Sequence, residues 1–189
     1  RRCSSEGYYC DKISIEKLKH FVSKEAFNID GFGKKIVENF WKLKFIKFPH
    51  DIFKLDYTKI EKLEGWGKLS AQNLKYSINQ KNNISLERLI YSLGIRHIGL
   101  ENAKLLSKHF MSFSKFKSLS KQSDYEEMLN IDGIGETQVS SIKSFFSNET
   151  NLKVLNELEK VLVIKDAIQN SDHGIFNNKT FLVTGKLNG

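Results

Sequence analysis

The sequence predicts an all-α domain built from four copies of one helical unit. A Gly-apolar-Gly motif, or a close variant of it, recurs along the chain at intervals of 32 to 36 residues. After each copy, apolar residues recur at spacings of three and four, which is the period of an amphipathic helix. With 40% apolar residues and one proline among 189 residues, the composition is that of a folded chain.

The repeat is defined by its second glycine, which falls at Gly33, Gly67, Gly99 and Gly135. In the third unit His97 stands where the first glycine would be. A short apolar-periodic segment precedes each motif, at 25–29, 60–63, 89–93 and 125–131. A longer amphipathic helix is expected after each motif, at 34–43, 68–78, 100–110 and 136–146. The four units together span roughly residues 25–147.

The remaining segments complete the predicted domain organisation. The connections at 44–58 and 111–124 are expected to form short helices and loops, and 149–161 a last helix with one charged and one apolar face. The helical domain is therefore placed at 13–167. Residues 168–178 are polar and predict a linker, and 179–189 open with a short apolar run typical of a β-strand.

The glycine motif has a chemical reading. Glycine adopts positive φ and has no Cβ, so Gly-x-Gly between two helices forms a tight hairpin with exposed backbone N–H groups. The second helix starts there with unpaired N–H groups and the positive end of its dipole, which together suit a phosphate oxygen. The central apolar residue is expected to pack inward and fix the hairpin. Lys34, Lys35 and Lys68 add cationic side chains beside two of these sites.

The charge of the chain agrees with a phosphate-rich partner. The formal net charge is +8 and the pI is near 9.3, which favours an acidic polymer and nucleic acid above all. Contacts to backbone phosphates predict sequence-independent binding of duplex DNA that weakens with salt. Glu136 is unfavourable beside a phosphate, so the fourth motif is expected to bind less tightly. The candidate DNA-binding residues are Gly31, Phe32, Gly33, Lys34, Lys35, Gly65, Trp66, Gly67, Lys68, Arg96, His97, Ile98, Gly99, Gly133, Ile134 and Gly135.

These residues carry a family resemblance. The four units resemble tandem helix-hairpin-helix motifs, arranged as a double helix-hairpin-helix domain. Their order is similar to the DNA-binding region of bacterial NAD-dependent DNA ligases: LKHFVSKEAFNIDGFGKKIVENF, DIFKL, LEGWGKLSAQNL, LGIRHIG and NIDGIGETQV. In that family a four-cysteine zinc finger precedes this region and a BRCT domain follows it. The resemblance assigns residues 1–12 to the end of the zinc finger, with Cys3 and Cys10 as a partial metal site, and 179–189 to the first strand of the BRCT domain.

The resemblance also implies an activity for the parent protein, which would be a DNA ligase using NAD, Mg and Zn for replication and repair. Its chemistry would belong to an adenylation domain and an OB-fold domain. Because no lysine here lies in a KxDG context, this chain is not expected to hold a cofactor of its own or to be active alone. Its expected partners are nicked double-stranded DNA and the adenylation, OB-fold and BRCT domains of the same protein.

Other readings stay open at this stage. A non-enzymatic double helix-hairpin-helix module, from a repair nuclease or a junction-binding protein, would share the four motifs. A helical-repeat scaffold with no nucleic-acid role would share the spacing but not the need for glycines. No apolar run approaches the roughly 18–20 residues that span a bilayer, and the first ten residues lack the apolar core of a signal peptide. The expected location is therefore the cytoplasm, with no membrane partner.

Overall fold

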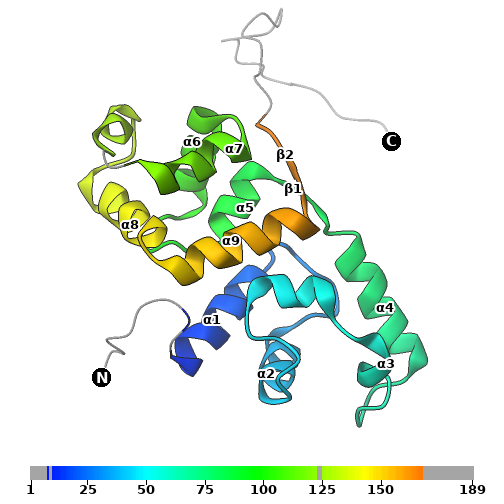
Figure 1. The fold of residues 1–189 in the computed structure, drawn as a ribbon. Helices are drawn as coiled ribbons and strands as arrows, with labels where there is room; N and C mark the ends of the chain where they lie inside the picture. The colour runs from blue at the N-terminus through cyan, green and yellow to red at the C-terminus, as the bar shows by residue number, and fades with distance from the viewer. Residues whose placement is uncertain (1–7, 9, 123–124, 168–189) are drawn as a thin grey trace, which may run out of the picture.

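In the computed structural model most of the described residues are helical, which confirms the all-α prediction (Figure 1). The structure describes residues 8, 10–122 and 125–167. Cys3, the expected linker at 168–178 and the expected strand at 179–189 lie outside these residues. The first helix begins at Asp11, so it takes in the last two residues of the segment assigned to the zinc finger.

The first half of the domain contains two of the four units and the connection between them. Its elements are α1 (Asp11–Phe21), α2 (Lys34–Lys42), the 3-10 helix η1 (Pro49–Lys54), α3 (Tyr57–Ile60) and α4 (Lys68–Asn79). Asp56 caps α3 by accepting a hydrogen bond from the Thr58 N–H at 3.1 Å. Proline at the first position of η1 suits its fixed φ.

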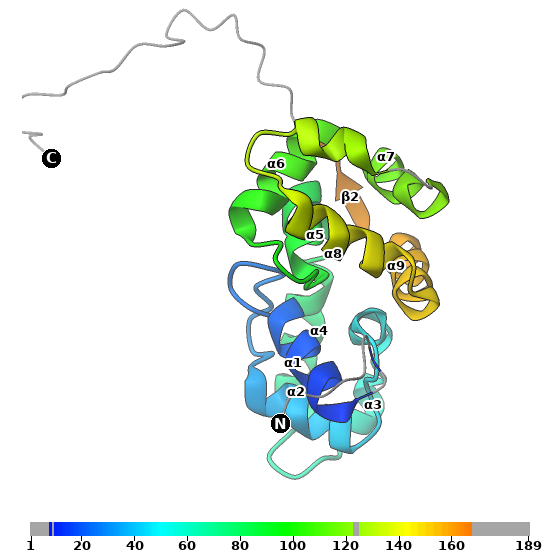
Figure 2. The same cartoon turned by 90° about the vertical axis from the view of Figure 1, so that its left-hand side faces the viewer.

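The second half contains the other two units and the last helix. Its elements are α5 (Leu86–Ser92), α6 (Leu100–Phe110), α7 (Phe113–Ser118), the 3-10 helices η2 (Leu119–Lys121) and η3 (Glu126–Asn130), α8 (Glu136–Phe146) and α9 (Glu149–Val161). The side chain of Asn148 caps α9, which occupies the predicted residues. In Figures 1 and 2 the two halves lie one above the other, and α9 runs between them and packs against η1.

The first helix of each unit varies more than the second. In the first unit it is α1, and residues 25–29 form turns because Asn28 takes the left-handed φ of 49° and ends any helical run. In the other three units α3, α5 and η3 fill this position, at or just before the apolar segments read from the sequence. The part of the geometry that all four units share is therefore the corner and the helix that follows it.

A two-stranded parallel sheet inside the helical domain is a feature that the sequence did not predict. Strand β1 (Asn83–Ser85) pairs with β2 (Val163–Lys165), and the Val163 N–H also donates to the Asn82 carbonyl at 2.8 Å. Each strand has three residues, too few for a period-two pattern to be recognised. Tertiary contacts specify this sheet, which fastens the end of α9 beside α5.

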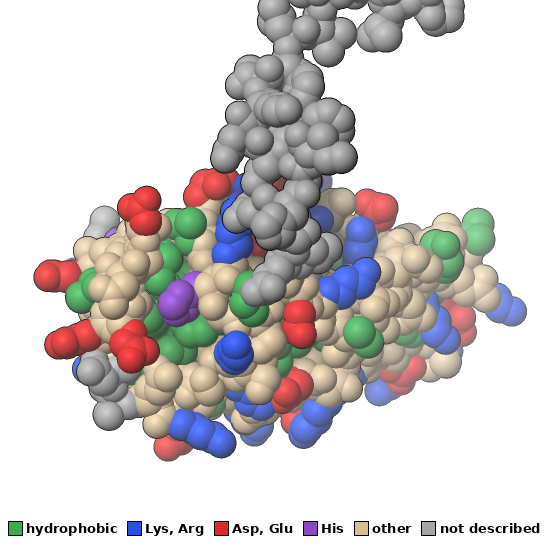
Figure 3. All heavy atoms as spheres, turned by 90° about the horizontal axis from the view of Figure 1, so that it is seen from above, with side chains coloured by type: hydrophobic (Ala, Val, Ile, Leu, Met, Phe, Trp, Pro, Cys, Tyr) green, Lys and Arg blue, Asp and Glu red, His purple; other side chains and the backbone are tan. Residues whose placement is uncertain are grey.

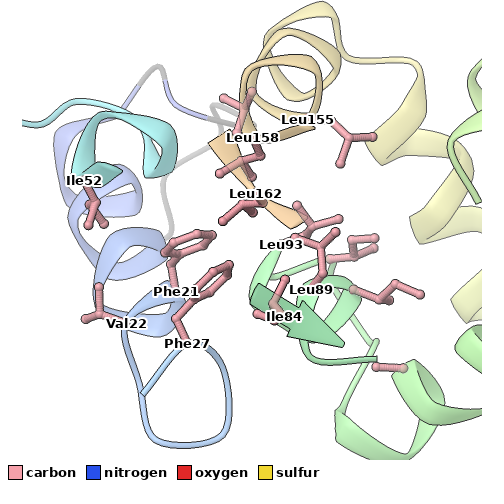
Figure 4. Packing of buried hydrophobic residues seen from close by; sticks show 14 of the residues in the cluster. Phe21, Val22, Phe27, Ile52, Ile84, Leu89, Leu93, Leu155, Leu158 and Leu162 are labelled. Atoms are coloured by element: carbon pink, nitrogen blue, oxygen red, sulfur yellow. The ribbon is translucent and has the colours of Figure 1, made fainter. Parts of the chain in front are cut away.

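The core of the molecule crosses from one half to the other. Figure 4 shows Phe21 and Phe27 of the first half directed toward Leu158 and Leu162, with Leu89 of α5 beside them. The Phe21 and Phe27 rings stack with centroids 4.2 Å apart, and all five side chains are buried. Burial of each contributes about 1.5–3 kcal/mol to folding. The two halves therefore share one hydrophobic core.

Hydrogen bonds add to this connection at the segment that precedes the first motif. The Arg88 guanidinium donates from Nε to the Ala26 carbonyl at 2.7 Å and from Nη2 to the Lys24 carbonyl at 2.8 Å. The His20 Nε2 lies 2.7 Å from the Tyr91 carbonyl. These contacts hold the turn at 23–28 against α5, so the first hairpin has a fixed orientation.

The packing of η1 against α9 predicts a pH dependence of stability. His50 is buried, and this burial lowers its pKa below 6.5, while Asp51 and Glu157 oppose the shift and Lys54 and Lys153 support it. The folded state therefore disfavours protonation. The stabilisation is fully present above the unfolded pKa and is lost as pH falls through the folded pKa. We expect the midpoint temperature of thermal unfolding to decrease when the pH is lowered from 7.5 to 5.5.

The matched variants for this measurement are His50→Asn and His109→Asn. His50→Asn removes the titrating group, so its unfolding midpoint should change less over the same pH interval. His109 is exposed at the end of α6, so its replacement should leave the pH dependence as it is. An unchanged pH dependence in His50→Asn would contradict the assignment to His50.

Candidate nucleic-acid interface

The four predicted motifs adopt one backbone geometry. We call residues 31–33, 65–67, 97–99 and 133–135 corners 1 to 4. The first residue of each corner has a left-handed φ: 75° at Gly31, 77° at Gly65, 60° at His97 and 87° at Gly133. The last residue of each is a glycine with extended backbone that serves as the N-cap of α2, α4, α6 or α8. His97 thus takes the conformation that glycine holds elsewhere.

A turn hydrogen bond closes every corner. In each, the N–H of the central residue donates to the carbonyl three residues earlier, and a positive φ at the third turn position is typical of a type II turn. The pairs are Phe32 to Ile29 (3.2 Å), Trp66 to Leu63 (3.0 Å), Ile98 to Ile95 (3.1 Å) and Ile134 to Ile131 (2.9 Å). The third corner therefore belongs to the repeat despite its histidine.

His97 predicts a gain of stability on replacement by glycine. A side chain in the left-handed region costs about 1 kcal/mol, although the Asn102 Nδ2 donor, 3.0 Å from the His97 carbonyl, helps to hold the conformation. We expect His97→Gly to raise the free energy of unfolding by about 0.5–1 kcal/mol in chemical denaturation. Gly31→Ala is the reciprocal change and should lower the free energy of unfolding. Its new Cβ would meet nothing within 4 Å, so the unfavourable φ would be the sole cause. Loss of stability in His97→Gly would contradict this account.

The central residues of the corners pack inward to different degrees. Phe32, Ile98 and Ile134 are buried, as predicted. Trp66 is only half-buried: its ring lies 5.6 Å from that of Phe40, and part of it stays accessible. The second corner therefore presents an aromatic surface where the other three present none.

Gly33 and Gly67 are open to an approaching group. Their φ values of −76° and −155° suit any residue, and an added Cβ would meet nothing within 4 Å at either position. Neither packing nor backbone conformation of the fold requires glycine here. Glycine is among the residues that suit an N-cap, and its bare backbone also leaves room for a group to approach closely from outside the molecule.

The free backbone donors differ among the corners. The Gly67 N–H donates to Ser70 Oγ at 2.9 Å, and the Gly135 N–H donates to Gln138 Oε1 at 3.2 Å. In the part of the chain that the structure describes, Gly33 and Gly99 have no such partner for their N–H groups. The caps from Ser70 and Gln138 were not anticipated, although a Ser or Gln three positions after the N-cap is a recognisable signal.

Lysines follow directly after the first two corners and not after the last two. Lys34, Lys35 and Lys68 are exposed, and within the described residues none of them forms an ion pair. By contrast, Glu101 and Glu136 occupy the first turns of α6 and α8. Arg96 and His97 are exposed beside corner 3. In Figure 3 acidic side chains likewise prevail over basic ones at the end that carries α8.

Corners 1 and 2 lie on either side of one groove. Its volume is about 550 Å³, and its lining includes Gly31 from corner 1 and Gly65 and Trp66 from corner 2, with Ile36 of α2 and Leu74 of α4 between them. Two motifs far apart in the sequence are therefore brought together in space.

The partial metal site has only one described member. Cys10 is a half-buried free thiol at the N-cap of α1, and Cys3 lies outside the described residues. Among the residues that the structure describes, no group of three or more His, Cys, Asp and Glu side chains could hold a metal ion. Any zinc site that uses Cys10 needs ligands from beyond these residues.

The described residues include no helix with the length and apolar character of a membrane span.

Four corners of this geometry, each between two helices, define a helix-hairpin-helix domain, and a family model for the helix-hairpin-helix motif matches residues 88–155. Over its full length the chain is 66% identical to a DNA ligase of Pelagibacter ubique (strain HTCC1062), of which it covers 28%. Over 98% of its length it is 45% identical to a DNA ligase of Wolbachia pipientis wMel, of which it covers 29%. Over almost its whole length the chain therefore corresponds to a region of these DNA ligases, it carries the helix-hairpin-helix motif there, and it spans less than a third of their length.

Proposed function

We propose that this domain binds duplex DNA through backbone phosphates, without sequence preference, as the DNA-gripping part of a DNA ligase. The observation that carries the proposal is the pairing of open glycines with unpaired lysines at corners 1 and 2. A phosphate oxygen can approach the bare backbone at Gly33 and Gly67, where the helix N-termini carry positive partial charge. Within the described residues the Gly33 N–H is a free donor, whereas the Gly67 N–H already donates to Ser70 Oγ. Lys34, Lys35 and Lys68 supply full charges beside them.

The two pairs of corners are proposed to contribute unequally. A carboxylate beside a phosphate is unfavourable, and Glu136 has no counterpart at corners 1 and 2. Glu101 at corner 3 is partly neutralised by Lys104 at 2.8 Å, and Arg96 and His97 add positive or neutral donors there. Corners 1 and 2 therefore dominate binding, corner 3 adds a smaller contribution and corner 4 adds least.

The parent protein would be an NAD-dependent ligase that seals nicks in replication and repair in the cytoplasm. NAD and Mg would act in its adenylation and OB-fold domains, and Zn in a finger that includes Cys3 and Cys10. No residue of this chain is proposed to hold NAD or Mg. Its contribution would be to hold the duplex while the other domains, including a BRCT domain, close around the nick.

A salt series on the isolated chain tests the proposal. Fluorescence anisotropy should show binding to nicked and intact duplexes of unrelated sequence with similar affinity, falling linearly on a log–log plot against salt concentration. No binding at low salt would favour a helical-repeat scaffold and overturn the proposal. A strong preference for four-way junctions over nicked duplex would favour a junction-binding module instead.

A further inference from the structure

The groove between corners 1 and 2 differs in character from its rim. Its walls include the apolar side chains of Ile36, Trp66 and Leu74, and the polar side chains of Asn73 and Ser77. Among the described residues no lysine or arginine lines it, whereas Lys34, Lys35 and Lys68 belong to the first turns of the two helices beside it. These three lysines thus lie on the two helices that contribute to the groove but are not part of its lining.

The negative charge of one carboxylate in the groove disfavours phosphate as its occupant. Asp30, the residue before corner 1, contributes to the lining and would repel an anion. The same carboxylate accepts hydrogen bonds from amino and imino groups, and the Asn73 amide can both donate and accept. The walls therefore suit a flat, neutral group with an apolar face and a polar edge, held by anionic groups on either side.

An unpaired nucleobase has this chemistry. We propose that the groove binds one unpaired base of a DNA strand whose flanking phosphates are held at corners 1 and 2, an inference that rests on the proposed function. The base stacks on the accessible part of Trp66, whose ring also packs against that of Phe40 at a centroid distance of 5.6 Å. Asp30, Asn73 and Ser77 meet its polar edge. The volume of about 550 Å³ lies within the roughly 300–1,000 Å³ of small-ligand sites.

Two measurements on the chain test this inference. A duplex with a one-nucleotide gap opposite a single unpaired 5-iododeoxyuridine should bind about tenfold more tightly than the same duplex fully paired. On irradiation the unpaired iodinated base should form a photo-crosslink to Trp66, located by mass spectrometry of the digested complex. The paired iodinated base should give no crosslink there. Equal affinity for the two duplexes, or a crosslink elsewhere only, would overturn the inference.

Variants that fill the groove separate this inference from the proposed function. Ser77→Phe and Asn73→Leu place bulk in the groove from two neighbouring turns of α4, at residues that belong to neither corner. Both should abolish the tenfold preference and keep the affinity for intact duplex. If both variants keep the preference, the base does not bind in this groove. Salt-dependent duplex binding without any gap preference rejects the inference alone, whereas loss of all duplex binding rejects the proposed function and the inference with it.

Discussion

Replacing Gly33 and Gly67 together with valine is expected to weaken duplex DNA binding about 100-fold while the helical fold survives. The added side chains occupy space that is empty in the structure, since a Cβ at either position meets nothing within 4 Å. In the proposed binding mode phosphate oxygens take that space, so each blocked corner would lose a backbone hydrogen bond to a charged group. At about 1.5 kcal/mol for each of the two corners, the loss amounts to about 100-fold in affinity. Anisotropy titration measures the affinity, and circular dichroism measures the helical content.

Threonine at the same two positions provides the matched control. Valine and threonine fill the same space, but threonine can still cap α2 and α4, whereas valine is a poor N-cap. Both double variants should lose DNA affinity, and only the valine variant should lose stability, by up to about 1 kcal/mol at each position. Retention of affinity in the threonine variant would show that nothing approaches these two glycines closely.

The equivalent change at Gly99 and Gly135 reports on the second pair of corners. Its backbone geometry matches that of the first pair, but its helices begin with Leu100 and Glu136 in place of lysines. The loss of affinity should therefore be smaller. A larger loss would reverse the proposed order of the two pairs.

The sequence predicted the corners well because their geometry depends on local residues. Glycine at a positive φ and glycine at the N-cap leave a visible pattern, and the helices that follow have the period of amphipathic helices. His97 is instructive, because only the spacing of the repeat placed this histidine at the position of the first glycine. In the structure it takes the left-handed φ of 60°, and the hydrogen bond from Ile98 to Ile95 closes the same turn.

What the sequence did not predict depends on contacts between distant segments. The β1–β2 pair joins residues about 80 positions apart, and neither three-residue strand has a pattern of its own. The half-exposed position of Trp66 follows from its contact with Phe40 of the preceding unit, so inward packing was only partly right. The groove itself forms where residues of α2 and α4 lie between corner 1 and corner 2, an arrangement that a repeat spacing cannot specify.

Replacing Lys34, Lys35 and Lys68 together with alanine is expected to reduce duplex affinity by about 10–100-fold near 0.1 M salt. Each lysine that neutralises a phosphate releases about 0.9 counterion, so the slope of log K against log salt should fall by about 2.7. All three side chains are exposed and, within the described residues, carry no ion pair, so folding should not suffer. Anisotropy at four or more salt concentrations gives the slope.

The control removes the same charge from other surfaces. Lys108, Lys121 and Lys143 are exposed, and each lies near the C-terminal end of its element, away from a corner. Either triple variant lowers the formal net charge from +8 by the same three units, so a general electrostatic attraction would weaken equally in both. Binding at the corners predicts a slope change confined to the first variant. Equal slopes would mean that the basic charge of the chain attracts DNA diffusely and that corners 1 and 2 do not hold specific phosphates.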